Sequence, residues 1–151
     1  MSDIYLDITR AIERLHRRFL DVIRHELNRL GVDDLNSMQA LLLTNIRDQE
    51  VTARDLMEKG YYIGSNISYN IKQLTDAGYV EQERSPRDKR SVLLRLTDKG
   101  LALCTQLQEL QNSQADAFVE GDVSEDSAVL VRDVLKRLER QWADYIHYGP
   151  G

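Results

Sequence analysis

The chain has 151 residues, 42 % hydrophobic and 30 % charged, which is typical of a soluble, largely helical protein with one core. It has no long uncharged apolar run and no signal peptide pattern, and its single cysteine cannot form an internal disulfide, so we expect a cytoplasmic protein without a membrane span. The net charge of −5 argues against nucleic acid, but residues 53–100 carry nine Lys and Arg against seven Asp and Glu, while the flanking segments total −7.

Apolar residues recur at three- and four-residue intervals and predict a first helix from Ile4 to Leu30, interrupted by Glu26 and ended by Gly31. Such a long two-sided helix needs more than one neighbour to bury it. Asn36 and Gln39 have the spacing of a capping box and predict the start of a second helix. The apolar stripe of the first helix is Ile8, Ile12, Leu15, Phe19, Val22 and Leu30. That of the second is Met38, Leu41, Leu42 and Ile46.

Thr52 and Asp55 predict a capped third helix that ends at Lys59-Gly60. Ser65 predicts the cap of a fourth helix, which ends at Ala77-Gly78 and buries Ile67, Ile71 and Leu74.

The opposite face of this fourth helix is polar but carries no charge. Amides and a phenol are suited to hydrogen bonding planar base edges, and Asn and Gln can each pair with adenine through two bonds. A merely solvated face would more often hold Lys and Glu. We therefore interpret this face as one that reads DNA bases. Its residues are Asn66, Tyr69, Asn70 and Gln73.

Two short strand patterns follow, at Val80–Arg84 and Arg90–Leu96, joined by a basic tip. A reading helix followed by a hairpin that contacts phosphate is the plan of a winged helix-turn-helix. We expect Arg87 to enter the minor groove and Asp88 to orient Arg90. The cationic residues expected to contact DNA are Arg84, Arg87, Lys89 and Arg90.

Thr97 predicts the cap of a fifth helix and Ser124 that of a sixth, which runs to about His147 after a break at Gly121-Asp122. The fold class is therefore mainly α with a small β wing, in the order four helices, hairpin, two helices. The first, fifth and sixth helices carry more apolar surface than one chain can cover, which predicts a homodimer. The apolar stripe of the fifth helix is Leu101, Cys104, Leu107 and Leu110. That of the sixth is Leu130, Val134, Leu138, Trp142 and Tyr145.

Three segments carry a resemblance to a known family: LNSMQALLLTNI at 35–46, the helix–turn from Thr52 to Val80, and DKRSVLLRLTDKG at 88–100. The last holds an Asp-x-Arg, a strand and Leu-Thr-x-x-Gly. Over almost its whole length the chain resembles the MarR family of dimeric winged-helix transcriptional regulators. The resemblance implies one MarR-like domain over 1–151, with a DNA-binding lobe at 35–100 and dimerisation helices at 1–30 and 101–148.

The resemblance further implies a homodimer that binds double-stranded DNA at a pseudo-palindromic operator. It also implies a small, often aromatic or anionic, effector in the cleft between the dimerisation helices and the DNA-binding lobe. Tyr61 and Tyr62 lie at the turn that leads into the fourth helix, and they are candidate ligand contacts because a bound aromatic there could push on that helix. Simple packing of the turn explains the two tyrosines equally well. Ser65 and Ser68 are expected to meet phosphate at the helix N-terminus, and Lys72 to reach the DNA backbone.

Other chemistry has little support in the sequence. His16 and His25 are nine residues apart on one helix, too far out of phase to hold one metal ion, and His147 lies near the C-terminus, so we expect no metal or other cofactor. Cys104 is expected to be a small buried side chain rather than a redox sensor. We find no pattern of an enzyme. The competing hypothesis is a winged helix that binds protein, which would not need the hairpin arginines.

Overall fold

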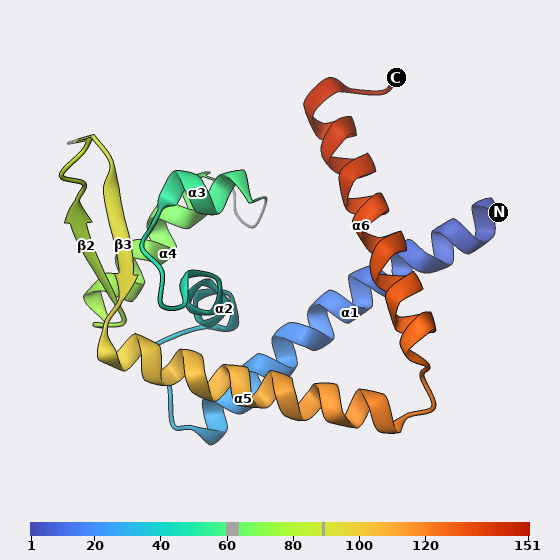
Figure 1. Ribbon diagram of the computed structural model, residues 1–151, viewed down its shortest axis with the longest axis horizontal. Helices are drawn as coiled ribbons and strands as arrows, with labels where there is room; N and C mark the ends of the chain where they lie inside the picture. Colours follow the sequence, from blue (N-terminus) through green and yellow to red (C-terminus); the bar gives the residue numbers. More distant parts are fainter. Residues whose placement is uncertain (60–63, 89) are drawn as a thin grey trace. The chain divides into compact units, whose positions relative to one another are not determined.

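The computed structural model describes residues 1–59, 64–88 and 90–151, with the side chains of residues 64 and 65 outside the description. The chain divides into two compact units, Met1–Leu110 and Gln111–Gly151, which are described separately. Figure 1 shows the elements, which are mostly helices with one small sheet, as the sequence predicts. In chain order they are α1 (Ser2–Arg29), α2 (Ser37–Ile46), β1 (Val51–Thr52), α3 (Ala53–Glu58), α4 (Gly64–Asp76), β2 (Val80–Arg84), β3 (Val92–Leu96), α5 (Asp98–Glu120) and α6 (Glu125–Tyr148).

The sheet is antiparallel in the order β1-β3-β2. The predicted hairpin is confirmed, with Val80 opposite Leu96 and Arg84 opposite Val92. The second strand starts at Val92 rather than at residue 90, because the residues before it form the turn. The two-residue strand β1 was not predicted; it is too short to show an alternating pattern, and it pairs with β3. Figure 1 shows the hairpin tip pointing away from the start of α5.

One continuous core joins the elements of the first unit. α1, α2, α3, α4, the sheet and the first half of α5 all contribute fully buried aliphatic side chains. Burying each of these stabilises the fold by about 1.5–3 kcal/mol relative to exposure. The largest of them are Ile23, Leu27, Leu42, Leu43, Ile46, Leu56, Ile67, Leu74, Leu94 and Leu107.

Helix caps form where the sequence predicts them and the structure describes the capping side chain. Asn36 and Gln39 make a full capping box at α2, and Thr52 and Asp55 make another at α3. Each satisfies backbone N–H groups that the first helical turn leaves unpaired. For α4, which begins at Gly64, the predicted cap depends on the side chain of Ser65, which lies outside the described residues.

Only part of each apolar stripe predicted for the long helices is buried within the single chain. In α1 the buried residues are Ile23, Glu26 and Leu27, whereas Phe19 and Val22 are exposed. Glu26 does not interrupt the buried face but belongs to it. Its carboxylate bonds to Arg29, which neutralises the buried charge and lowers the pKa of Glu26.

The faces of α2 and α5 are also rotated relative to the prediction. Met38 is exposed, while Ala40 and Leu43 are buried beside Leu42 and Ile46. In α5 the buried residues are Gly100, Leu103 and Leu107, while Leu101 is exposed and Cys104 and Leu110 pack partly against the core. In α5, Gly100 lies on the buried face, where its Cα approaches the Tyr79 carbonyl so closely that a side chain would not fit.

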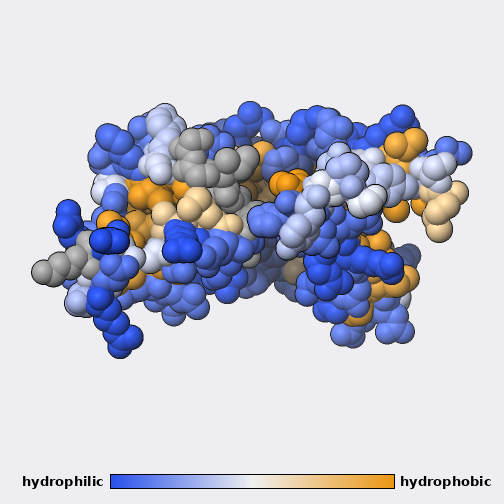
Figure 2. Space-filling model, turned by 90° about the horizontal axis from the view of Figure 1, so that it is seen from above, coloured by the Kyte–Doolittle hydropathy of each residue, from blue (hydrophilic) through white to orange (hydrophobic). Residues whose placement is uncertain are grey.

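In the second unit, α6 has the predicted Ser124 cap, whose hydroxyl accepts the backbone N–H of Ser127. Of the predicted stripe only Leu138 is buried. The other four members, Leu130, Val134, Trp142 and Tyr145, are exposed in the single chain. Figure 2 shows that orange hydrophobic patches lie among a largely hydrophilic surface.

Candidate nucleic-acid interface

α4 has the two predicted faces. Ile67, Ile71 and Leu74 are buried in the core of the first unit. On the other side Asn66 is exposed, Tyr69 is 60 % exposed, and Asn70 and Gln73 are half-buried at the edge of the face. The apolar stripe therefore anchors the helix so that an uncharged polar face is turned outward.

Asn70 makes a contact that the sequence did not predict. Gln39 of α2 donates a hydrogen bond from Nε2 to Oδ1 of Asn70 at 3.4 Å. Gln39 itself is buried, and its Oε1 accepts the backbone N–H of Asn36 at 3.0 Å. The sequence identified Gln39 only as a cap; its second role depends on how α2 and α4 pack together.

The other predicted contacts on and near α4 are less uniform. Lys72 forms an ion pair with Asp76 one turn along the helix, at 2.8 Å. Both side chains are well exposed, so the pair is weak and Lys72 can exchange it for another anion. Ser68 is exposed on α4. The predictions for Tyr61, Tyr62, Lys89 and the side chain of Ser65 fall outside the described residues.

The hairpin tip is held by its own side chains. The Ser85 hydroxyl accepts the backbone N–H groups of Arg87 and Asp88 at 3.3 and 3.4 Å. Asp88 accepts the backbone N–H of Arg90 at 3.0 Å and the Ser91 hydroxyl at 3.1 Å. Asp88 thus fixes the backbone around Arg90, through the main chain and not through the guanidinium group.

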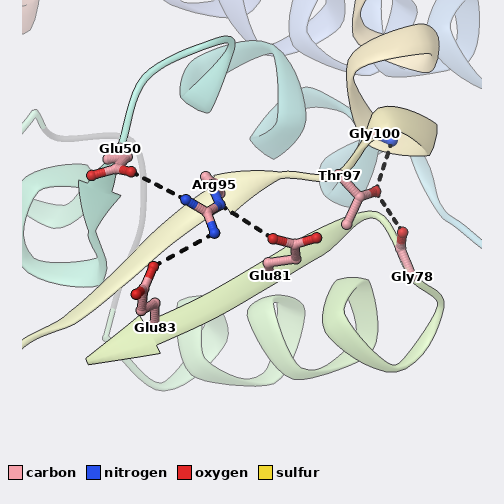
Figure 3. A network of polar contacts seen from close by, with 7 residues as sticks. All are labelled: Glu50, Gly78, Glu81, Glu83, Arg95, Thr97 and Gly100. Carbon is pink, nitrogen blue, oxygen red and sulfur yellow. Dashed lines mark hydrogen bonds and ion pairs between the residues drawn. The ribbon is translucent and has the colours of Figure 1, made fainter. Parts of the chain in front are cut away.

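The arginines of the hairpin differ in their surroundings. Arg95 on β3 contacts Glu81 and Glu83 of β2 and Glu50 before β1, at 3.2, 3.5 and 3.4 Å (Figure 3). These carboxylates, led by Glu81, raise the pKa of Arg95. Within the described part of the chain, no salt bridge occupies the three tip arginines, which are Arg84, Arg87 and Arg90. Charge at the base of the hairpin is therefore compensated, and charge at its tip is available.

A polar cluster holds the turn between α4 and β2. The Tyr79 hydroxyl donates to Asp34 at 2.8 Å, and Lys99 of α5 lies 3.5 Å from the same carboxylate and 4.2 Å from the centre of the Tyr79 ring. Lys99 also donates to the Ala77 carbonyl at 2.9 Å. Burial, followed by the bond to Asp34, raises the pKa of Tyr79 to about 12. The end of α4 is therefore tied to α5 and to the segment before α2.

A shallow open groove of about 260 Å³ lies between α3, α4 and the hairpin. Its lining combines apolar and polar side chains. The apolar residues are Ala53, Ile71, Val92 and Leu94, and the polar ones are Ser68, Lys72 and Gln82.

Other kinds of site have less support among the described residues. There, no three His, Cys, Asp or Glu side chains are grouped so that they could hold a metal ion. No helix in the same residues is both long and apolar enough to cross a membrane. Cys104 is partly buried, and this burial raises the pKa of its thiol, which disfavours the reactive thiolate.

The geometry defines a winged helix, with an anchored polar helix beside a hairpin that carries uncompensated arginines. Residues 35–100 match the family model of a winged helix DNA-binding domain. The chain is 39 % identical over 145 residues to the exopolysaccharide II synthesis transcriptional activator ExpG of Rhizobium meliloti, covering 96 % of this chain and 75 % of that protein. This relative is named as a transcriptional activator.

Solved structures agree on the fold. A mutant of Escherichia coli MarR in complex with operator DNA superposes with a TM-score of 0.74 at 23 % identity, over 90 % of this chain and 96 % of that one. Streptomyces coelicolor PcaV, solved in complex with its natural ligand, gives a TM-score of 0.67 at 21 % identity, over 86 % and 89 %. The chain belongs to the MarR family of winged-helix, DNA-binding transcriptional regulators.

Proposed function

We propose that this protein binds a pseudo-palindromic DNA operator as a homodimer and that a small ligand modulates the binding. Each subunit places α4 in a major groove and the hairpin tip in the adjoining minor groove. A protein that binds chromosomal DNA works where that DNA is, which in a bacterium is the cytoplasm. The observation that supports this proposal best is the exposed, uncharged polar face of α4 next to three tip arginines outside the salt bridges of the hairpin.

The two elements have different tasks in this proposal. Asn66, Tyr69 and Gln73 contact base edges, which gives sequence preference. Arg84, Arg87 and Arg90 contact phosphates and the minor groove, which gives affinity that depends on salt. The dimer places two such sets about one helical turn apart, so a half-site repeats with that spacing.

The test is a binding titration of Arg87→Ala at several salt concentrations, on DNA selected from a random double-stranded pool. We expect weaker binding to all sequences and a salt slope reduced by about one counterion. Arg17→Ala, which removes an exposed charge from α1 outside residues 35–100, is the matched control and should leave the slope unchanged. An unaltered slope for Arg87→Ala would contradict the assignment of the tip. A protein that selects no DNA sequence would favour the alternative, a winged helix that binds protein.

The dimer is supported by apolar side chains that remain exposed in the single chain. On α1 these include Ile4, Leu6, Leu15 and Phe19, and on α6 they include Val129, Leu130, Val131, Leu135 and Ile146. Monomeric proteins rarely leave so many large apolar side chains exposed together on their helices, and a second copy is the usual way to cover them.

Ligand control is supported by two observations. PcaV was solved with its natural ligand. In this chain the lining of the groove beside α4 combines apolar side chains with Lys72, which suits an aromatic anion. A ligand can release DNA only if it prefers the conformation that does not bind DNA. Titrating benzoate into the protein–DNA complex tests this, and Val92→Phe, which narrows the groove, should reduce any release. Release that is unchanged in Val92→Phe points to another site, such as the cleft beside the dimerisation helices.

A further inference from the structure

We propose that Gln39 is a positioning residue that sets the hydrogen-bond polarity of Asn70, so that α4 presents an amide donor to DNA at this position. The inference rests on the proposed function, because it requires α4 to face base edges. It concerns a residue of α2 that lies behind the reading face. Gln39 is 6 % exposed, so it acts on DNA only through Asn70.

The order of the amide atoms follows from what each group can do. The backbone N–H of Asn36 can only donate, and it points at Gln39 at 3.0 Å, so the oxygen Oε1 of Gln39 must be the atom that faces it. The Nε2 group of Gln39 is then the end directed at Asn70, at 3.4 Å. Since Nε2 donates, the oxygen of Asn70 must face it in turn.

The capping box keeps this order from reversing. Turning both amides over would set the NH2 group of the buried Gln39 against the backbone N–H of Asn36, so that two donors would face each other and the hydrogen bond of the capping box would be lost. Among the described residues, no buried side-chain nitrogen or oxygen lacks a hydrogen-bond partner. The capping residue Asn36 therefore fixes Gln39, and Gln39 fixes Asn70.

The consequence for recognition is a change in what Asn70 can read. A free asparagine pairs with adenine through its oxygen and its NH2 group together. Here the oxygen is turned toward α2, and the NH2 group is the end turned away from it. An outward donor favours bases that offer acceptors in the major groove, such as guanine N7 and O6 or thymine O4. It disfavours cytosine, which offers the N4 donor.

Gln39→Glu tests this relay, because glutamate has the same shape and is equally good in a capping box. One carboxylate oxygen still accepts the N–H of Asn36. The other oxygen can only accept, so Asn70 rotates, gives its NH2 group to Glu and turns its oxygen outward. We expect one base pair in each half-site to change its preference from guanine or thymine to cytosine or adenine, by about tenfold in relative affinity. The readout is selection from a random double-stranded pool, followed by titrations on operators that differ at that pair.

The added negative charge must be separated from the change in polarity. Charge lowers affinity for all operators alike, whereas polarity changes the ratio between them. Gln39→Glu in an Asn70→Ala background is the matched control, and it should weaken binding without altering base preference. Asn70→Asp with Gln39 retained approaches the same state from the other side, because its second oxygen faces outward. It should shift preference in the same direction as Gln39→Glu, with circular dichroism confirming that all variants are folded.

The outcomes separate this inference from the proposed function. If the wild type selects a DNA sequence but neither Gln39→Glu nor Asn70→Asp changes the preferred base, the relay does not exist and the inference is overturned. The same holds if Asn70→Ala leaves the preference of the wild type intact, since Asn70 then reads no base. If the wild type selects no sequence at all, the proposed function fails first.

Discussion

Replacing Gly100 with alanine should destabilise the fold although the change adds a single methyl group to a helix. Gly100 lies in the first turn of α5, and a Cβ atom there would lie 2.2 Å from the carbonyl oxygen of Tyr79. That separation is about 1 Å shorter than an unstrained contact between carbon and oxygen. The carbonyl is backbone, so it cannot move aside as a flexible side chain would.

The size of the stability loss follows from the hydrogen bonds that Thr97 makes beside Gly100. The Thr97 backbone N–H donates to Tyr79 O at 3.0 Å. The Thr97 hydroxyl donates to Gly78 O at 2.6 Å and accepts the Gly100 N–H at 3.2 Å (Figure 3). Moving α5 by about 1 Å would break about two of these bonds, at about 1 kcal/mol each. Overpacking strain adds about 1–3 kcal/mol, and alanine returns about 0.5–1 kcal/mol of helix propensity. The net loss is about 2–4 kcal/mol.

The assay is thermal and urea unfolding at one fixed protein concentration, because a dimer gains stability with concentration. A loss of this size lowers Tm by roughly 5–15 °C for a chain of this length. Gly121→Ala is the matched control, since the nearest atom to its added Cβ is Phe118 O at an ordinary 3.4 Å. It should change stability by less than about 0.5 kcal/mol. If Gly100→Ala is as stable as this control, the close approach does not explain why glycine ends the Leu-Thr-x-x-Gly pattern.

Three further predictions concern the dimer, a cap and the sheet. Leu130 is 65 % exposed in the single chain, and Leu130→Glu should lower the dimer fraction measured by sedimentation. A dimer as strong as that of the wild type would contradict the assignment of α6 to the dimer interface. The Thr52 backbone N–H lowers the pKa of Asp55, so the stability that this carboxylate contributes is present at neutral pH and is lost as the pH falls below about 4. The difference in unfolding free energy between the wild type and Asp55→Asn, measured in urea titrations, should therefore disappear over that pH range. Arg95→Met should lower the free energy of unfolding by less than about 1 kcal/mol, because the ion pairs are exposed. It should weaken DNA binding most at low salt, because three carboxylates lose their cation and then repel the DNA. Equal weakening at all salt concentrations would refute this.

The winged-helix fold could be predicted because its signals are local. Capping boxes at Asn36 and Thr52, the period of the α4 stripe and the two short strand patterns of the hairpin all lie within short windows. The faces of the long helices were predicted less well. Periodicity shows that a helix is amphipathic, but when apolar residues occur on two sides it does not show which side meets the core. Glu26 illustrates this, because a carboxylate appears as an interruption until its bond to Arg29 is known.

The candidate site shows the same limit for individual side chains. The sequence places Arg84 and Arg87 near the basic tip, but it does not show which arginines of the hairpin are paired with carboxylates. Only the pairing of β3 with β2, which sets Arg95 opposite Glu81, separates a compensated arginine from those at the tip. The excess of positive charge in residues 53–100 is small as a sum. It matters because Glu50, Glu81 and Glu83 form their ion pairs with Arg95 on β3, whereas the described ion pairs leave the tip arginines uncompensated.

Asn70 shows the same limit for the orientation of a single amide group. Its residue type and its place on α4 suit base reading, and both can be seen in the sequence. Which end of its amide faces outward depends on Gln39, which lies 31 residues earlier and has its own orientation set by the start of α2. Two regulators with the same reading helix could therefore prefer different bases if they differ at the residue behind it. In this protein, the proposed relay makes α2 a contributor to recognition, because Gln39 sets the polarity with which Asn70 of α4 is read.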